Sequence, residues 1–222
     1  MRALIRFAKR PRLRFISHLD LQRFFQRAVN RTGLPIAYSQ GFNPHPVISF
    51  GSALAVGWTS EYEIIDIKLN APMGRKRTED AMRAALPEDL PVMEVRMIDD
   101  RHPAPMALVR MADYRVDLEG DGVGEMIDHI PLLLAQKEII TFKKTKSGEK
   151  QIDARPLVIS VEPQESGFLT RLMLTERESI KPDHLACILA QISGVKTPEM
   201  HIHRTILLGD DAAGVPRPLM EL

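Results

Sequence analysis

Apolar and polar residues follow two periods along the chain, and together these periods predict its elements. Alternation of two residues is typical of strands, and a repeat of three to four is typical of amphipathic helices. In the first half we expect strands at residues 2–8, 35–39, 47–50, 61–69 and 92–98, and helices at 17–32 and 77–86. In the second half we expect strands at 107–118, 138–144, 157–161, 168–175 and 199–208, and helices at 124–136 and 182–192.

We assign the order β-α-β-β-α-β to each half, with one extra strand segment near 47–58 in the first and three strands, one more than the pattern, between the helices of the second. This order predicts an α+β protein made of two tandem ferredoxin-like halves with antiparallel sheets. We place the first half at residues 1–98 and the second at 106–210. Residues 99–105 are polar, contain two prolines and have the character of a linker. Residues 211–222 carry Pro216 and Pro218, and we expect a poorly ordered tail.

The helix that starts at Ser17 has two different faces. Its apolar face falls at i, i+3 and i+4 positions, which are Leu21, Phe24, Phe25, Ala28 and Thr32. The opposite face carries Arg23, Arg27 and Arg31 at four-residue intervals, so their guanidinium groups stack along one side of the helix. Guanidinium groups in a row can fork onto successive phosphates. With Arg12 and Arg14 just before the helix, they form a predicted RNA-binding surface.

The charge of the chain is unevenly distributed, although its overall value is only +1. Residues 1–31 hold nine Lys or Arg residues and a single acid, Asp20, which gives +8 and leaves −7 for the rest. A local basic field of this size attracts a polyanion such as nucleic acid. The alternative is a solvated face whose basic groups pair with acids elsewhere in the fold.

A loop of hydrogen-bonding and aromatic side chains follows the helix. It contributes the candidate RNA-binding residues Ser39, Gln40, Phe42, Asn43 and His45. Gln40 and Asn43 can bind a base edge, and His45 can donate to a phosphate. Phe42 can stack on a base, or it can fill the core beneath a rigid turn. Ligand sites concentrate on loops of this kind.

Histidines and lysines supply the remaining candidates. His18 together with His45 could act as acid and base in metal-independent RNA cleavage, and His18 could equally contact RNA or pack at the helix start. No metal site is expected, because His18, Asp20 and His45 lack a recognised ligand spacing. A basic turn could bind phosphate or could be an ordinary solvated turn; its lysines are Lys143, Lys144, Lys146 and Lys150.

Other classes of protein are disfavoured by what the sequence lacks. The single cysteine, Cys187, excludes an internal disulfide and a cysteine-rich iron–sulfur or zinc site, and it favours a reducing compartment. There is no phosphate-binding glycine loop or dinucleotide fingerprint, so no cofactor is expected. No apolar run is long enough to span a membrane, and the arginine-containing N-terminus is unlike a signal peptide. We expect a cytoplasmic protein.

Two motifs resemble a known family. They are RxRFISHLDLQR over residues 12–23 and GLPxxYSQGFNPHP over residues 33–46, and weaker points are Asp153-x-Arg155-Pro156 and Arg204-Thr205. The match resembles an uncharacterised bacterial family of radical SAM-associated proteins, which stand alone or are fused to the C-terminus of cobalamin-type radical SAM proteins. The resemblance implies a companion of a radical SAM enzyme. The pattern is more distantly similar to tandem ferredoxin-like CRISPR endoribonucleases, although their glycine-rich C-terminal region is reduced here to Gly209 and Gly214.

Three functional hypotheses follow from these observations. The first is an RNA-binding accessory protein that presents tRNA or rRNA to a partner radical SAM enzyme and has no catalytic activity of its own. The second is an endoribonuclease that uses His18 and His45. The third is a protein-interaction scaffold that docks an acidic partner and binds no nucleic acid.

Overall fold

The computed structural model describes residues 1–145 and 148–222, which form two compact units. Unit 1 contains Met1–Val109 together with Ile206–Leu222, and unit 2 contains Arg110–Thr205. The predicted halves differ from this division at their ends. The sequence predicted a second half that ends at residue 210 and a separate tail at 211–222. In the structure, Ile206–Leu222 belong to unit 1.

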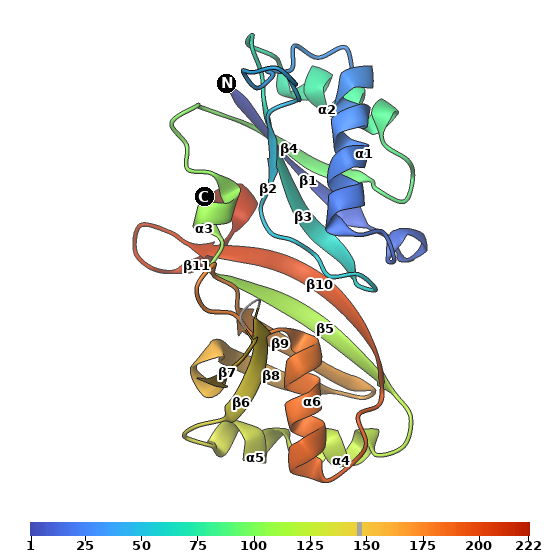
Figure 1. The fold of residues 1–222 in the computed structure, drawn as a ribbon, viewed down its shortest axis with the longest axis vertical. Coiled ribbons are helices and arrows are strands. Elements are labelled where there is room, and N and C mark those ends of the chain that lie inside the picture. Colours follow the sequence, from blue (N-terminus) through green and yellow to red (C-terminus); the bar gives the residue numbers. More distant parts are fainter. Residues whose placement is uncertain (146–147) are drawn as a thin grey trace. The chain divides into compact units, whose positions relative to one another are not determined.

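Unit 1 is built on an antiparallel sheet in which β1 is central. Strand β1 pairs with β4 on one side and β3 on the other, and β2 pairs with β3 (Figure 1). The elements are β1 (Arg2–Lys9), η1 (Pro11–Leu13), α1 (His18–Arg31), β2 (Ile48–Phe50), β3 (Thr59–Lys68), α2 (Arg75–Ala85), β4 (Val92–Ile98), α3 (Pro105–Leu108), β11 (Pro216–Pro218) and η3 (Leu219–Glu221).

The core of unit 1 lies between this sheet and helices α1 and α2. Phe25 of α1 packs its ring 4.8 Å from Phe7 of β1 and 5.5 Å from Phe50 of β2, measured between centroids. Met82 supplies the buried face of α2. These contacts fix the rotation of α1 about its axis, because turning the helix would expose Phe25 to water.

Unit 2 repeats the arrangement of helices on a sheet. Its strands follow the order β10-β5-β9-β8, and β5–β9 and β8–β9 are antiparallel. Helices α4, α5 and α6 pack together and against β8 and β9. The elements are β5 (Met111–Glu119), α4 (Val123–Asp128), α5 (Ile130–Ala135), β6 (Ile140–Thr145), β7 (Gly148–Asp153), η2 (Arg155–Leu157), β8 (Val158–Gln164), β9 (Gly167–Met173), α6 (Pro182–Ser193) and β10 (Glu199–Asp210), whose last residues belong to unit 1.

The fold is a mixed α and β structure with mostly antiparallel pairing. Most predicted elements are present, and the helix predicted over residues 124–136 is divided into α4 and α5, with Pro131 in the first turn of α5. Three predictions about elements are wrong. Residues 35–39 form only isolated bridges and no strand. The strand predicted from residue 107 is preceded by α3 and begins at Met111. Strand β7 (Gly148–Asp153) pairs with β6 (Ile140–Thr145) in a two-stranded sheet, of which only β6 was expected.

The C-terminal segment also differs from its prediction as a poorly ordered tail. Strand β11 pairs with the end of β10, and Leu219 and Met220 are buried. The backbone N–H of Met220 donates to the Tyr62 hydroxyl at 3.2 Å, and Arg96 donates to the Met220 carbonyl at 2.9 Å. Within the described part of the chain, no helix is long and apolar enough to cross a membrane.

Candidate nucleic-acid interface

Helix α1 places its arginines on the side away from the core. Ser17 caps the helix by accepting a hydrogen bond from the Asp20 N–H at 3.2 Å, and its hydroxyl donates to the Asp20 carboxylate at 2.7 Å. The buried residues of the helix are Leu21, Phe25, Ala28 and Val29, whereas Arg23, Arg27 and Arg31 are exposed. The structure therefore confirms the predicted division of this helix into an apolar and a basic face.

The exposed arginines differ in how strongly the fold holds them. Arg23 has only a distant contact with Asp20, 3.4 Å between Nη1 and Oδ1. Arg27 forms no ion pair with any described residue. Arg12 is 85% exposed and lies 3.7 Å from Asp89. Arg31 donates to the carbonyls of Arg27 and Ala85, so it also joins the end of α1 to the end of α2. Among the arginines predicted to bind RNA, Arg12, Arg23 and Arg27 are thus the most available to a ligand.

Three other basic residues among residues 1–31 have structural contacts within unit 1. Arg2 binds the carboxylate of Asp66 through Nε at 3.0 Å and through Nη2, and both side chains are largely buried. Arg6 lies 3.5 Å from Glu94 and 5.0 Å from the centroid of the Tyr62 ring. Lys9 is only 1% exposed. The charge of +8 counted from the sequence is therefore divided between a structural part and a surface part.

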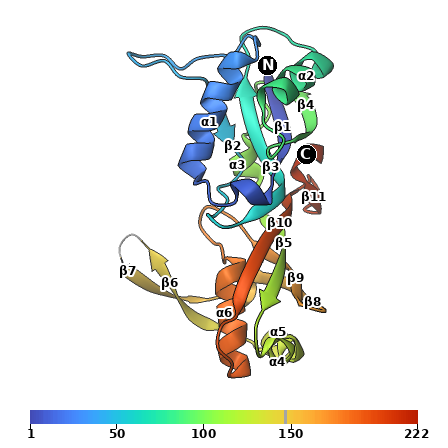
Figure 2. The ribbon, with the colours of Figure 1, turned by 90° about the vertical axis from the view of Figure 1, so that its right-hand side faces the viewer.

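The predicted loop after α1 is anchored at its base and free at its tip. Ser39 Oγ lies 3.0 Å from His45 Nδ1 and accepts the His45 N–H at 3.1 Å, and the Ser39 N–H donates to the His45 carbonyl at 2.9 Å. Tyr38 donates its hydroxyl to Asn30 of α1 at 2.6 Å. Figure 2 shows the segment between α1 and β2 extending away from the sheet.

At the tip of this loop, Gln40, Phe42 and Asn43 are all exposed. Phe42 is fully exposed, so it does not plug the core. An exposed aromatic ring beside two amide side chains is able to stack on a base and bind its edge.

The two histidines are held at opposite ends of α1. His18 begins the helix, and its ring packs edge-on against Phe50, with 5.1 Å between centroids. His45 belongs to the loop base that Tyr38 ties to Asn30, near the other end. With a rise of about 1.5 Å per residue, His18 and Asn30 are about 18 Å apart along the axis. The structure does not bring the two imidazoles to one phosphate, which a paired acid and base would need.

The lysine candidates belong to unit 2. Lys146 and the side chains of Lys143 and Lys144 lie outside the described residues. Lys150 is exposed on β7, where its backbone pairs with that of Lys143. Among the described residues, no group of three or more His, Cys, Asp or Glu side chains could hold a metal ion.

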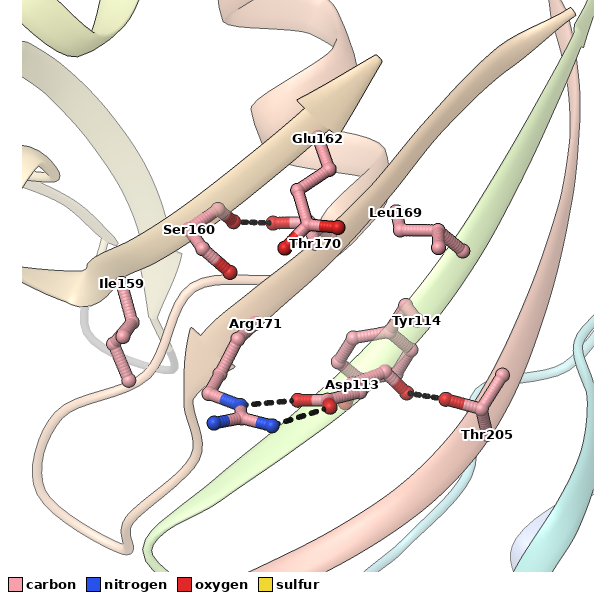
Figure 3. A pocket seen from close by; sticks show the side chains of 9 residues that line it. All are labelled: Asp113, Tyr114, Ile159, Ser160, Glu162, Leu169, Thr170, Arg171 and Thr205. Atoms are coloured by element: carbon pink, nitrogen blue, oxygen red, sulfur yellow. Dashed lines mark hydrogen bonds and ion pairs between the residues drawn. The ribbon is translucent and has the colours of Figure 1, made fainter. Parts of the chain in front are cut away.

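Unit 2 has a cavity of about 370 Å³ beside strands β5, β8 and β9. Burial alternates along β5 and β9, and the less buried positions Asp113 and Arg171 line this cavity. Arg171 of β9 binds Asp113 of β5 with two hydrogen bonds, Nε to Oδ1 at 2.7 Å and Nη2 to Oδ2 at 2.8 Å (Figure 3). This pair raises the pKa of Arg171, and Glu162 adds a smaller effect of the same sign. One guanidinium between two carboxylates leaves the cavity without a net positive charge, so it is poorly suited to phosphate.

A second cavity, of about 430 Å³, lies at the start of α6. Its lining includes the exposed Phe142 and the only thiol, Cys187. His184, on the same helix, shares a hydrogen bond of 2.7 Å with Thr141.

The sequence did not single out several residues of these sites. Asp113 and Arg171 are far apart in the chain, and only the register of β5 and β9 makes them neighbours. Phe15 was overlooked for another reason: an isolated Phe before a helix is usually a core residue, but this one is 69% exposed. Its position directly after Arg14 in a basic turn was the available signal.

The chain matches the model of a known protein family. The model of a protein family described as "Uncharacterized protein conserved in bacteria (DUF2344)" matches residues 2–182. No curated protein matches the chain. The matched range includes all of the basic surface of unit 1 and ends at the start of α6.

Proposed function

The chain belongs to the bacterial protein family DUF2344, and we propose that it acts as an RNA-binding accessory protein that presents tRNA or rRNA to a partner radical SAM enzyme. The observation that carries the RNA-binding part is the outer face of α1 with the preceding turn. There Arg12, Arg23 and Arg27 stay exposed with distant partners or none among the described residues. Exposed guanidinium groups in a row suit a polymer of phosphates.

A nucleic acid accounts for this surface better than an acidic protein does. The charges are accompanied by a fully exposed Phe42 and by the amides of Gln40 and Asn43 at a loop tip. Phosphate contacts position a nucleic acid, and base contacts give it specificity. Unpaired bases need flat apolar surfaces and amide groups, which are the side chains that this tip offers. An acidic protein surface would pair with the arginines but would not need the aromatic ring and the two amides.

The radical SAM partner is supported by the resemblance of residues 12–23 and 33–46 to radical SAM-associated proteins. A companion that holds RNA would leave the reaction itself to the partner. Copurification of tagged chain with a radical SAM protein from the native cells is expected under this proposal. Loss of that copurification after ribonuclease treatment would show that RNA joins the two.

We also propose that each unit is ferredoxin-like, so that the chain is a tandem of two such halves. The support is the strand order. Unit 1 has β4-β1-β3-β2, and unit 2 has β10-β5-β9-β8, with the paired strands β6 and β7 inserted in the chain between α5 and β8. In the β-α-β-β-α-β pattern the first and third strands are neighbours, as β1 and β3 are in unit 1 and β5 and β9 in unit 2. The helices lie in the two connections between strands one and two and between strands three and four.

The proposed function is tested by charge reversal with a matched control. The test variant is Arg12→Glu, Arg23→Glu, Arg27→Glu, and the control is Arg115→Glu, Arg177→Glu, Lys196→Glu, which are exposed positions of unit 2. Both change the net charge equally. We expect the test variant to bind single-stranded RNA at least about tenfold more weakly than wild type, or roughly 1.4 kcal/mol. The control should bind within about twofold of wild type. Equal losses in both variants, or no binding by wild type, would refute the proposal.

A further inference from the structure

Phe15 is an exposed aromatic residue at the turn between η1 and α1. It is 69% exposed, whereas the apolar neighbours Leu13 and Ile16 pack against the core of unit 1. The turn therefore packs two partly buried apolar side chains inward and directs the third outward. Burial of a Phe side chain typically contributes about 1.5–3 kcal/mol, and the fold forgoes much of that at this position.

The backbone on both sides of Phe15 is fixed. The ammonium group of the buried Lys9 donates to the carbonyl of Arg14 at 3.1 Å and to that of Ile16 at 3.0 Å. The N–H of Gly57 also donates to the Arg14 carbonyl, at 2.8 Å. Gly57 has a φ of 89°, a left-handed conformation that glycine adopts without strain. The outward position of the ring is thus set by buried contacts and does not result from a loose loop.

A cation lies over one face of the ring. The guanidinium carbon of Arg14 is 4.5 Å from the ring centroid, and Arg14 Nη1 donates to the Pro11 carbonyl at 3.3 Å. Because Arg14 lies over this face, the other face and the edge of the exposed Phe15 ring are left for a ligand. A flat apolar ring with a cation behind it attracts another π-system, because the cation polarises the stack.

The surroundings of the ring carry the charge that a nucleic acid needs. Leu19, in the first turn of α1, is exposed. It lies four residues before Arg23 and eight before Arg27. Residues four apart lie on the same helix face, so Leu19 begins the line that the two arginines continue. Arg12, on the other side of Phe15 in the chain, is exposed as well.

We infer that Phe15 is a stacking site for one unpaired base of a single-stranded RNA whose phosphates contact Arg12, Arg23 and Arg27. The inference rests on the proposed RNA-binding function and adds a base-binding site to it. Stacking on an aromatic side chain contributes about 1–3 kcal/mol per base and tolerates any base, since every base has a π-face. The site would therefore strengthen binding without selecting sequence, in contrast to the amides at the tip of the loop.

The test uses single-stranded RNA that contains 2-aminopurine, whose fluorescence falls when the base stacks. The test variant is Phe15→Leu, which keeps an apolar side chain and removes the π-system. Phe15→Tyr keeps the ring, and Phe142→Leu changes an exposed Phe of unit 2 as a matched control. We expect Phe15→Leu to weaken binding by about five- to 100-fold and to lose the quenching at one position of the RNA. Its dependence on salt should stay that of wild type, and both other variants should behave as wild type.

Two results would overturn the inference. If wild type binds RNA in a salt-dependent way and Phe15→Leu binds equally well with the same quenching, the base-stacking site does not exist and the proposed function stands. If wild type binds no RNA, both fail, and the exposed ring then fits a contact with a protein. A folding defect is excluded by comparing thermal unfolding of the Phe15→Leu and Phe15→Tyr variants.

Discussion

On the outer face of α1 in unit 1, Arg23 and Arg27 extend into solvent with at most a distant acidic partner among the described residues. On the sheet face of unit 2, by contrast, Arg171 is bound by two hydrogen bonds to Asp113, and Arg115 lies 3.0 Å from Asp117. Both surfaces are rich in charge, but only the first leaves its cations available. Pairing, and not the number of charged residues, decides whether a surface can bind an anion.

The same distinction between paired and available cations exists within residues 1–31. Arg2 and Arg12 are ten residues apart and chemically identical, yet Arg2 is held by the buried Asp66 and Arg12 is 85% exposed. The charge of a segment therefore overestimates its capacity for a ligand until the structural cations are subtracted. The predictions below separate the two groups, from the largest effect to the smallest.

The largest effect is expected for Arg2→Met. It leaves the buried carboxylate of Asp66 without its guanidinium, and breaking such a pair costs about 3–5 kcal/mol. Arg12→Met should change stability by less than about 0.5 kcal/mol, as is usual at an exposed site. Urea denaturation of the two variants measures this difference. Equal stabilities would mean that the Arg2–Asp66 pair does not support the fold.

A smaller loss of stability is expected for Arg171→Met in unit 2. Its pair with Asp113 is partly exposed to solvent, so we expect a cost of about 1 kcal/mol. RNA affinity should be unchanged, because this cation is already neutralised by its partner. Filter binding alongside urea denaturation checks both parts. A tenfold loss of RNA affinity would place part of the interface on unit 2 and would contradict the comparison.

The loop after α1 should affect selectivity more than strength. Gln40→Ala with Asn43→Ala removes amides from an exposed loop tip, while the bonds between Ser39 and His45 keep the base of the loop closed. We expect preference among RNA sequences to fall by about 1 kcal/mol, with the salt dependence unchanged. Competition between RNAs of different sequence measures the preference. A change in the salt dependence instead would show that the loop binds phosphates.

The smallest effect concerns the buried Lys9. Burial lowers its pKa from the usual 10.5, and Glu63 opposes the shift by a smaller amount. Between the lowered pKa and 10.5 the unfolded chain binds more protons at this residue than the folded chain does. The contribution of Lys9 to the free energy of unfolding therefore rises with pH in that window. Lys9→Met should lack this rise, which unfolding curves at several alkaline pH values would reveal as a widening difference from wild type.

Local patterns predicted the elements that depend on local chemistry. Helix α1 was predicted within one residue at each end, because Ser17 caps it and its apolar positions repeat with the helical period. The exposed arginine face followed from the same period. Strand β7 escaped prediction because its sequence, GEKQID, is polar with no apolar alternation.

Long-range pairing explains what could not be predicted. Residues 35–39 have the composition of a strand, but Pro35 and the isolated bridges of Ile36 and Tyr38 leave them without a ladder. The end of the chain is ordered by contacts of Met220 with Tyr62 and Arg96, far away in sequence. The structural roles of Arg2 and Lys9 likewise depend on partners that only the fold supplies.

The salt dependence of RNA binding tests the central claim most directly. Each phosphate contact with a single strand contributes roughly 0.7 to the slope of log affinity against log salt concentration. The account predicts a slope for Arg12→Glu, Arg23→Glu, Arg27→Glu that is lower than that of wild type by about 2, since three contacts are lost. The matched variant Arg115→Glu, Arg177→Glu, Lys196→Glu should keep the wild-type slope. A folded test variant with the wild-type slope and affinity would show that α1 is only a solvated surface, and would contradict the account.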